Sequence, residues 1–275
     1  MDSDNDNAFL NTLSADALFE LALTTNDNDQ AWNAISRLHT IATDDVFTKA
    51  VHLCHSQNAL ERSLGVNVIA QIGLPQHTYQ EPTAQLLLQL IETEDSPIVL
   101  ESIGMALGHR NDERAVEPLL PFQQHPDPSV RYSVAFGLLG QTNPRAIACL
   151  IALSADPDTD IRDWATFGLA QQIDTDTPAI REAFIARLHD PGGNTAGEAM
   201  VGLARRKDAR VIAPLMQLLQ AGDAGSLLFE AAATLGDPVL LPILEQIRTH
   251  WEGDHDWQYR TLIEAIDACT PNAVE

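Results

Sequence analysis

The sequence predicts an all-α protein, an α-solenoid in which antiparallel helix pairs stack one after another. Three observations predict this fold: a ten-residue pattern recurs at an offset of 31 residues, its apolar residues lie four apart, and Asp-Pro turns separate the segments. Side chains four apart share one face of an α-helix. Because a lone helix pair cannot cover its own apolar face, neighbouring pairs must stack.

The recurring pattern is clearest in residues 129–138 and 160–169, where seven positions are identical or similar. Self-similarity of this kind indicates a repeat architecture. The last apolar position of the pattern recurs at intervals of 31 to 38 residues, at Leu38, Ile69, Leu107, Leu138, Leu169, Leu203 and Leu235. We therefore expect about seven repeats.

Each repeat also contains a second apolar segment, since residues 111–120 parallel residues 207–216 with a proline near the start. Proline is tolerated in the first turn of a helix. Turns with a candidate N-cap occupy residues 95–97, 125–128, 156–158 and 190–193. We predict a single solenoid domain over residues 1–275, with an N-terminal cap and acidic tail (1–28), repeats (29–250) and a C-terminal capping helix (251–275).

The charge balance predicts the kind of partner. Acidic residues number 39 and basic residues 16, a formal net charge of -23, and only Lys49 and Lys207 are lysines. Such a field disfavours nucleic acid and anionic lipid, which bind clustered lysine and arginine. We expect a basic protein partner; the alternative is a general solubility adaptation. Without a long apolar stretch or a basic signal-peptide start, the chain is expected to be cytoplasmic.

Residues 127–138 and 158–169 carry an Asp-Pro or Pro-Asp turn followed by Val/Ile-Arg and then small or apolar residues four apart. This pattern resembles HEAT repeats, particularly the bacterial form related to phycobilisome-lyase HEAT-like repeats. Segments 161–165, 205–208 and 230–237 resemble the YibA group of bacterial HEAT proteins. The resemblance implies a protein-binding scaffold, and some relatives resemble immunity or antitoxin partners of toxins. The repeat arginine occurs at Arg62, Arg131 and Arg162 only, so an arginine ladder would be interrupted.

No local catalytic signature is present: the sequence lacks G-x-S-x-G, the Walker lysine loop, G-x-G-x-x-G and H-E-x-x-H. None of the nine histidines precedes a glutamate, unlike the iron-binding dipeptides of HEAT-repeat deoxyhypusine hydroxylases. The acidity disfavours a DNA glycosylase. We expect no catalytic residue and no cofactor; the alternative is a phycobilin-lyase-like or other catalytic HEAT-repeat protein.

Two incomplete metal patterns occur. Asp156, Asp158 and Asp160 imitate the start of a calcium loop that then lacks its glycine and its final glutamate. The segment from His52 to His55, with Cys54 between them, offers only part of a zinc ligand set. We expect no metal, and we expect Cys54, Cys149 and Cys269 to be buried thiols. The basic cluster Arg205, Arg206, Lys207 and Arg210 fits a helix C-terminus better than a phosphate site.

The helix that carries the repeat arginine resembles the lining of the concave face in HEAT solenoids. The two columns of residues just after the arginine position are predicted to point away from the buried row. They combine aromatic residues, which anchor interfaces, with carboxylates, which accept arginine. The predicted partner-binding residues are Trp32, Glu101, Tyr132, Asp163, Trp164, Glu198, Phe229 and Glu230. In the alternative, the aromatic rings pack between repeats and the acids face water.

Overall fold

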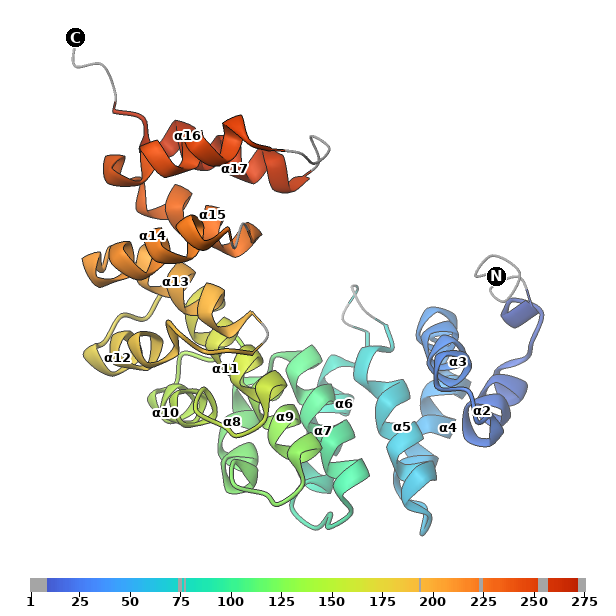
Figure 1. The fold of residues 1–275 in the computed structure, drawn as a ribbon. Coiled ribbons are helices and arrows are strands. Elements are labelled where there is room, and N and C mark those ends of the chain that lie inside the picture. The colour runs from blue at the N-terminus through green and yellow to red at the C-terminus, as the bar shows by residue number, and fades with distance from the viewer. Residues whose placement is uncertain are drawn as a thin grey trace. The chain divides into compact units, whose positions relative to one another are not determined.

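A computed structural model describes residues 9–271 except 74, 75, 77, 193, 223, 224 and 252–256. Every regular element in those residues is an α-helix or a 3-10 helix, and none is a strand (Figure 1). The all-α prediction is therefore confirmed. None of the helices in the described ranges combines the length and the hydropathy that crossing a bilayer requires.

The chain forms two compact units, Met1–Leu139 and Gly140–Glu275. The helices of the first unit are α2 (Ala15–Thr24), α3 (Asn28–Ile41), α4 (Asp44–Cys54), α5 (Ala59–Gln71), α6 (Gln80–Leu90), α7 (Pro97–Arg110), η1 (Glu113–Ala115), α8 (Val116–Leu119), η2 (Leu120–Phe122) and α9 (Pro128–Gly137). Those of the second are α10 (Pro144–Leu153), α11 (Thr159–Gln171), α12 (Pro178–Arg187), α13 (Thr195–Arg205), η3 (Ala209–Val211), α14 (Ile212–Ala221), α15 (Ser226–Leu235), η4 (Pro238–Leu240), α16 (Leu241–Thr249) and α17 (Trp257–Cys269).

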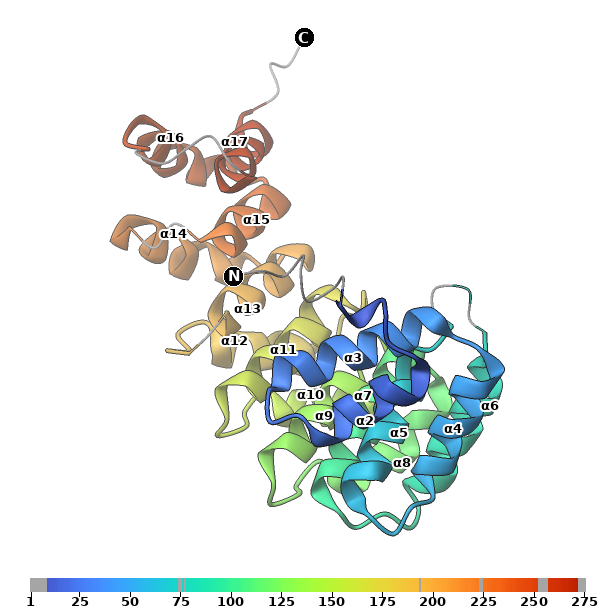
Figure 2. The same ribbon diagram turned by 90° about the vertical axis from the view of Figure 1, so that its right-hand side faces the viewer.

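Within each unit the helices pair in chain order, and the odd-numbered helix comes second in its pair (Figure 2). The odd-numbered helices stack on one another: α5 on α7 on α9 in the first unit, and α11 through α17 in the second. The segments predicted as caps contain α2 and α17, which pack against α3 and α16 as helices of further pairs. Stacked antiparallel pairs confirm the predicted solenoid class.

The recurring apolar column forms the core of the stacks. Leu38, Ile69, Leu107, Leu138, Leu169 and Leu203 are all fully buried, and Leu235, the last residue of α15, is half-buried. Helices α7 and α9 approach closely because both carry glycine at the contact. A Cβ atom on Gly137 would lie 2.9 Å from the Gly104 carbonyl oxygen. A larger residue there would force the helices apart.

The Asp-Pro turns begin the odd-numbered helices as predicted. Asp127 is the N-cap of α9, its carboxylate accepts the Ser129 N–H at 2.9 Å, and Pro128 follows in the first turn. Asp158 caps α11 in the same way and accepts from the N–H groups of Asp160 and Ile161. These carboxylates satisfy donors that a helix leaves unpaired at its N-terminus.

The repeat arginines are structural. Arg62 and Arg162 each donate from Nη1 to two carbonyl oxygens of the turn that precedes their helix. Each also pairs with a carboxylate in the following turn: Arg62 with Glu94 at 2.8 Å and Arg162 with Asp190 at 2.9 Å. Both are bidentate pairs, the stronger form of charge-assisted hydrogen bonding. These guanidinium groups link successive repeats and are largely withdrawn from solvent.

The basic cluster after α13 binds backbone carbonyls and carboxylates, as the helix C-terminus interpretation predicts. Arg206 is buried and donates to the carbonyl oxygens of Leu169 and Ile173 at 3.0 and 3.2 Å. Arg205 pairs with Asp174, Arg210 pairs with Asp208 and Glu182, and the Lys207 ammonium donates to the Leu235 carbonyl oxygen. Arg110, which the sequence did not single out, is likewise buried and donates to Ile72.

Candidate functional site

The odd-numbered helices α3, α5, α7 and α9 of the first unit line a groove of about 440 Å³. Three of the predicted partner-binding residues, Trp32, Glu101 and Tyr132, lie in it. They occupy one register position on α3, α7 and α9, which is why a single sequence column brings them to one surface. The groove thus gathers three of the eight predicted residues, and the other five lie in the second unit.

Apolar side chains stand exposed in the groove. Trp32 has 53% of its surface exposed and Ile98 has 40%, although both are large hydrophobic residues. Single exposed apolar residues are common, but these two lie in one groove that polar groups also line. Tryptophan is also a side chain that contributes strongly to interfaces when a partner covers it.

Glu101 is the one carboxylate among the described residues that line the groove, which contains no lysine or arginine. Its side chain is half-buried, and among the described residues it makes no hydrogen bond or ion pair. Burial, together with the charge of Asp127, raises the pKa of Glu101. A partly desolvated carboxylate without a partner is unfavourable, and a cation in the groove would relieve that cost.

Neutral hydrogen-bonding groups cover the groove floor. The hydroxyls of Ser63 and Ser102 lie 2.8 Å apart. The Asn67 amide nitrogen donates weakly, at 3.5 Å, to Ser63, and Gln71 lies 3.2 Å from the ring of His109. Burial lowers the pKa of His109, and the nearby His39 and Arg110 lower it further, so the neutral ring is favoured. The floor is polar but uncharged.

In the second unit, Asp163, Glu198 and Glu230 lie on the successive odd-numbered helices α11, α13 and α15. Burial raises the pKa of Glu198 to about 7; a hydrogen bond from Gln171 at 2.7 Å opposes the shift, and the charges of Asp163 and Glu230 add to it. Asp163 is half-buried and accepts from Thr195 at 3.4 Å. Glu230 makes no hydrogen bond or ion pair within the described ranges.

The expected exposure of two predicted residues is wrong. Phe229 is fully buried and lies against Trp251, so its ring belongs to the core. Glu198 is only 7% exposed. The second of the two columns includes Glu198, Ser102 and Ser133, which are all buried. A helix in a stack contacts neighbours on both sides, so the surface that stays open is narrower than the polar arc of an isolated helix.

Trp164 is half-buried and packs edge-to-face on Phe167 of the same helix, at 5.7 Å between ring centroids. The partner-binding role of Trp164 stays a prediction, as it does for the other residues of the two columns.

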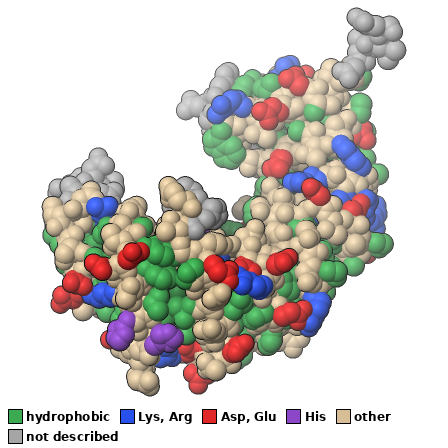
Figure 3. Space-filling view, turned by 180° about the vertical axis from the view of Figure 1, so that it is seen from behind, with side chains coloured by type: hydrophobic (Ala, Val, Ile, Leu, Met, Phe, Trp, Pro, Cys, Tyr) green, Lys and Arg blue, Asp and Glu red, His purple; other side chains and the backbone are tan. Residues whose placement is uncertain are grey.

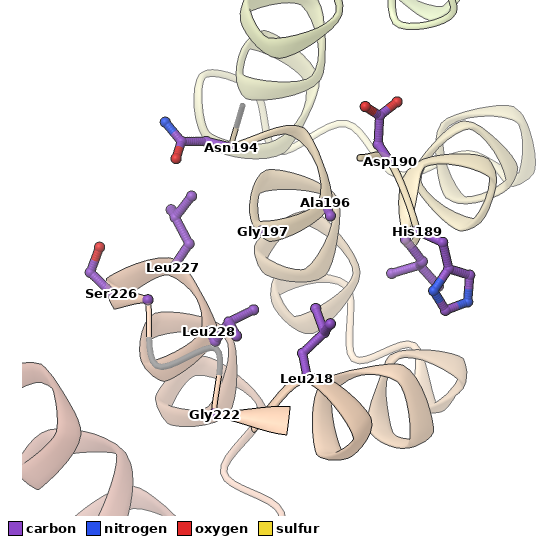
Figure 4. Close-up of a pocket in the computed structure, with 12 residues that line it drawn as sticks. His189, Asp190, Asn194, Ala196, Gly197, Leu218, Gly222, Ser226, Leu227 and Leu228 are labelled. Atoms are coloured by element: carbon purple, nitrogen blue, oxygen red, sulfur yellow. The ribbon is translucent and has the colours of Figure 1, made fainter. Parts of the chain in front are cut away.

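A second cavity, of about 590 Å³, lies where α12 and α14 end and α13 and α15 begin (Figure 4). The side chains of His189 and Asp190 point in different directions there. The Asp190 carboxylate is already engaged by Arg162, Arg187 and the Gly192 N–H. Its charge is therefore balanced within the protein, which distinguishes it from Glu101.

The two metal-like patterns have structural roles. The Asp156 carboxylate accepts the Asp158 N–H, and Asp158 caps α11. Cys54 is fully buried between His52 and His55, which are both exposed, and burial raises the pKa of its thiol to about 12. The described residues contain no group of three or more potential ligands placed to hold a metal ion. All three cysteines are buried thiols, as expected.

The sequence columns missed several groove residues. Asn67 lies four residues after Ser63, Met105 lies four after Glu101, and Asn28 lies four before Trp32. Residues four apart share a helix face. Extending the first column by one helical turn in each direction would have found them.

Acidic side chains on the face shown in Figure 3 are spread out, with lysine and arginine between them. This dispersion is consistent with the many carboxylates that cap helices or pair with arginines. The net charge alone therefore does not locate a binding surface, and individual carboxylates must be judged by their partners.

Comparison with known proteins supports the repeat assignment. A family model described as HEAT repeats matches residues 84–170. Protein YibA of Escherichia coli K12 is 39% identical over 70 residues, which are 26% of this chain and 25% of YibA. The chain thus matches about a quarter of the length of this relative, and the same holds for YibA of Escherichia coli O157:H7.

Solved structures share the fold over nearly the whole chain. The crystal structure of Escherichia coli YibA superposes with a TM-score of 0.76 at 24% identity and covers 95% of both chains. Yeast importin-beta, Kap95p, superposes with a TM-score of 0.59 at 13% identity, covering 92% of this chain and 38% of Kap95p. Its structure concerns the binding of Kap95p to RanGDP. Residues 84–170 are therefore similar to HEAT repeats, and the chain shares the fold of YibA.

Proposed function

We propose that this protein is a non-enzymatic scaffold that captures a basic partner protein on its odd-numbered helices. The observation that carries the proposal is Glu101, a half-buried carboxylate that has no partner among the described residues. None of the described residues that line its groove is a lysine or arginine that could balance its charge. A lysine or arginine of a partner would complete the site with a charge-assisted hydrogen bond.

Three further features support a binding role. Trp32 and Ile98 are exposed beside Glu101 and would contribute apolar contact area. Glu230, on the odd-numbered helix α15 of the second unit, is a second carboxylate with no partner in the described part of the chain. Scaffolds of HEAT repeats commonly bind other proteins, and Kap95p, with a similar fold, binds RanGDP. An immunity or antitoxin type of inhibitor, covering a basic protein, is one form of this function.

Catalysis is disfavoured by the spacing of the groove's titratable side chains. Glu101 and His109 lie eight residues apart on α7, which is about 12 Å along a helix axis. An acid and a base that share a proton must lie within hydrogen-bond reach or be bridged by one water. The groove is therefore better suited to holding a ligand than to transferring a proton.

The test uses a labelled, unstructured peptide rich in arginine and leucine, with an otherwise equal glutamate peptide as its counterpart. We expect the basic peptide to bind and the acidic one not to bind. Glu101→Gln should weaken binding about five- to tenfold, or about 1 kcal/mol, at low salt. The loss should shrink at high salt, because salt screens the attraction.

Glu20→Gln is the matched control, because Glu20 is an exposed carboxylate on α2, outside the groove, and the change in net charge is the same. It should leave affinity within about twofold of the wild type, a difference of about 0.4 kcal/mol. Equal affinities of the Glu101→Gln and Glu20→Gln proteins for the basic peptide would refute the proposal.

A further inference from the structure

The polar side chains on the floor of the first-unit groove indicate which chemical groups of a ligand they can bind. Besides Glu101, its hydrogen-bonding side chains are neutral amides, hydroxyls and one histidine, among them Asn28, Asn67 and Gln71. An amide side chain both donates and accepts, so it matches the N–H and C=O groups of a peptide bond.

Asn67 is the best placed of these amides. It lies in the middle of α5, its nitrogen makes only the 3.5 Å contact with Ser63, and its side-chain oxygen has no hydrogen-bond partner among the described residues. The backbone carbonyl of Asn67 is already used, since it bonds to the His39 ring at 2.9 Å. The side chain thus keeps a free acceptor and a weakly used donor toward the groove.

The arrangement of the helices sets the register of a ligand that lies across them. Packed helices lie about 8 to 10 Å apart, and an extended chain advances about 3.3 Å per residue. Equivalent positions on neighbouring odd-numbered helices therefore meet about every third residue of an extended segment. Trp32, Ser63, Glu101 and Tyr132 are such equivalent positions on α3, α5, α7 and α9.

We infer that the groove binds an extended segment of a partner protein through its peptide backbone, with the amide side chain of Asn67 bonded to a peptide group and a basic side chain of the segment directed to Glu101. Trp32 and Ile98 contact apolar side chains of the same segment. The basic character of the segment is taken from the proposed function. Recognition of its backbone is inferred separately, from the neutral polar side chains of the groove floor.

The experiment replaces single backbone amides by esters in the basic peptide used above, which removes one N–H donor at a time and keeps every side chain. In the wild-type protein, we expect a three- to tenfold loss of affinity at a few positions, spaced about three residues apart. In the Asn67→Leu variant, affinity for the all-amide peptide should fall. At one of those positions, the ester peptide should then bind the variant as tightly as the all-amide peptide does. Such non-additivity identifies a direct pair.

Asn33→Leu is the matched control, because Asn33 is exposed on α3 and lies outside the groove. It should bind every peptide as the wild type does. Circular dichroism and the melting temperature check that each variant is folded.

If esters have no effect at any position while Glu101→Gln still weakens binding, the backbone inference is wrong and the proposed function stands. If ester positions matter while Glu101→Gln has no effect, the groove binds an extended segment and the basic character of the partner is wrong. If neither change alters affinity, both proposals fail.

Discussion

At the scale of single residues, the carboxylates of this protein differ in burial and in the partners that they bind. Glu94 and Asp190 are held in bidentate pairs with arginine, Glu101 has no partner among the described residues, and Glu198 is buried beside Gln171. The environment of each carboxylate decides whether it stabilises the fold, keeps an unbalanced charge or titrates near neutrality. The acidic residues of this chain therefore have several separate physical roles.

Glu198 should make stability depend on pH. Its pKa is raised from 4.5 to about 7, chiefly by burial, so the folded state keeps a proton that the unfolded state has lost. The contribution of Glu198 to stability should therefore be greatest below about pH 4.5 and fall as pH rises toward 7, by up to about 3 kcal/mol.

Urea unfolding between pH 4.5 and pH 7.5 measures this effect. Glu198→Gln keeps the side chain's shape and an acceptor for Gln171 but cannot ionise, so the variant should be more stable than the wild type at pH 7.5 and similar at pH 4.5. An identical pH dependence of the two proteins would show that Glu198 titrates normally.

At the scale of the helical elements, arginines hold the turns of successive repeats together. Arg162 binds the Asp156 and Pro157 carbonyl oxygens and the nearly buried Asp190 carboxylate. Burial acts to raise the pKa of Asp190, but hydrogen bonds from Arg162 and the Gly192 N–H outweigh it and leave the pKa below its ordinary value. The pair thus links the turn before α11 to the turn after α12.

Arg162→Ala should destabilise the protein by about 2 to 4 kcal/mol, because it removes the bidentate pair from a nearly buried carboxylate and the donor from two carbonyl oxygens. Arg162→Lys should recover only part of the loss, since an ammonium cannot form the bidentate pair. Arg205→Ala is the control: its partner Asp174 is almost fully exposed, so the cost should be below about 1 kcal/mol. Chemical unfolding ranks the three variants, and equal losses for Arg162→Ala and Arg205→Ala would contradict the linking role.

At the scale of the whole molecule, a formal net charge of -23 should oppose compaction. Like charges repel in the folded chain more than in the expanded one. We expect the melting temperature to rise by several degrees between about 10 mM and about 150 mM sodium chloride, over which the Debye length falls from about 30 Å to about 8 Å. Calorimetry at pH 7.5 gives the measurement, with a sugar of equal osmolality as the control. A melting temperature that falls over this range would mean that the internal ion pairs dominate over repulsion.

The sequence by itself determined the class of fold. Apolar residues four apart and recurring every 31 to 38 residues are a local and periodic signal, so they identified α5, α7, α9, α11 and α13 without any tertiary information. Asp127 and Asp158 could be recognised as N-caps because a cap bonds to residues beside it in the chain. The sequence also placed Trp32, Glu101 and Tyr132 on one surface, since residues in the same register on stacked helices lie on the same face of the stack.

Only the tertiary structure decided which polar residues stay open. Phe229 and Glu198 share columns with exposed residues but are buried, because their surroundings come from helices one repeat away along the chain. Glu101 and Asp190 show the same dependence: both are carboxylates, yet Glu101 has no partner in the described structure and Asp190 binds two arginines. Burial and pairing depend on atoms far apart in sequence, and periodicity records only which face of a helix a residue occupies.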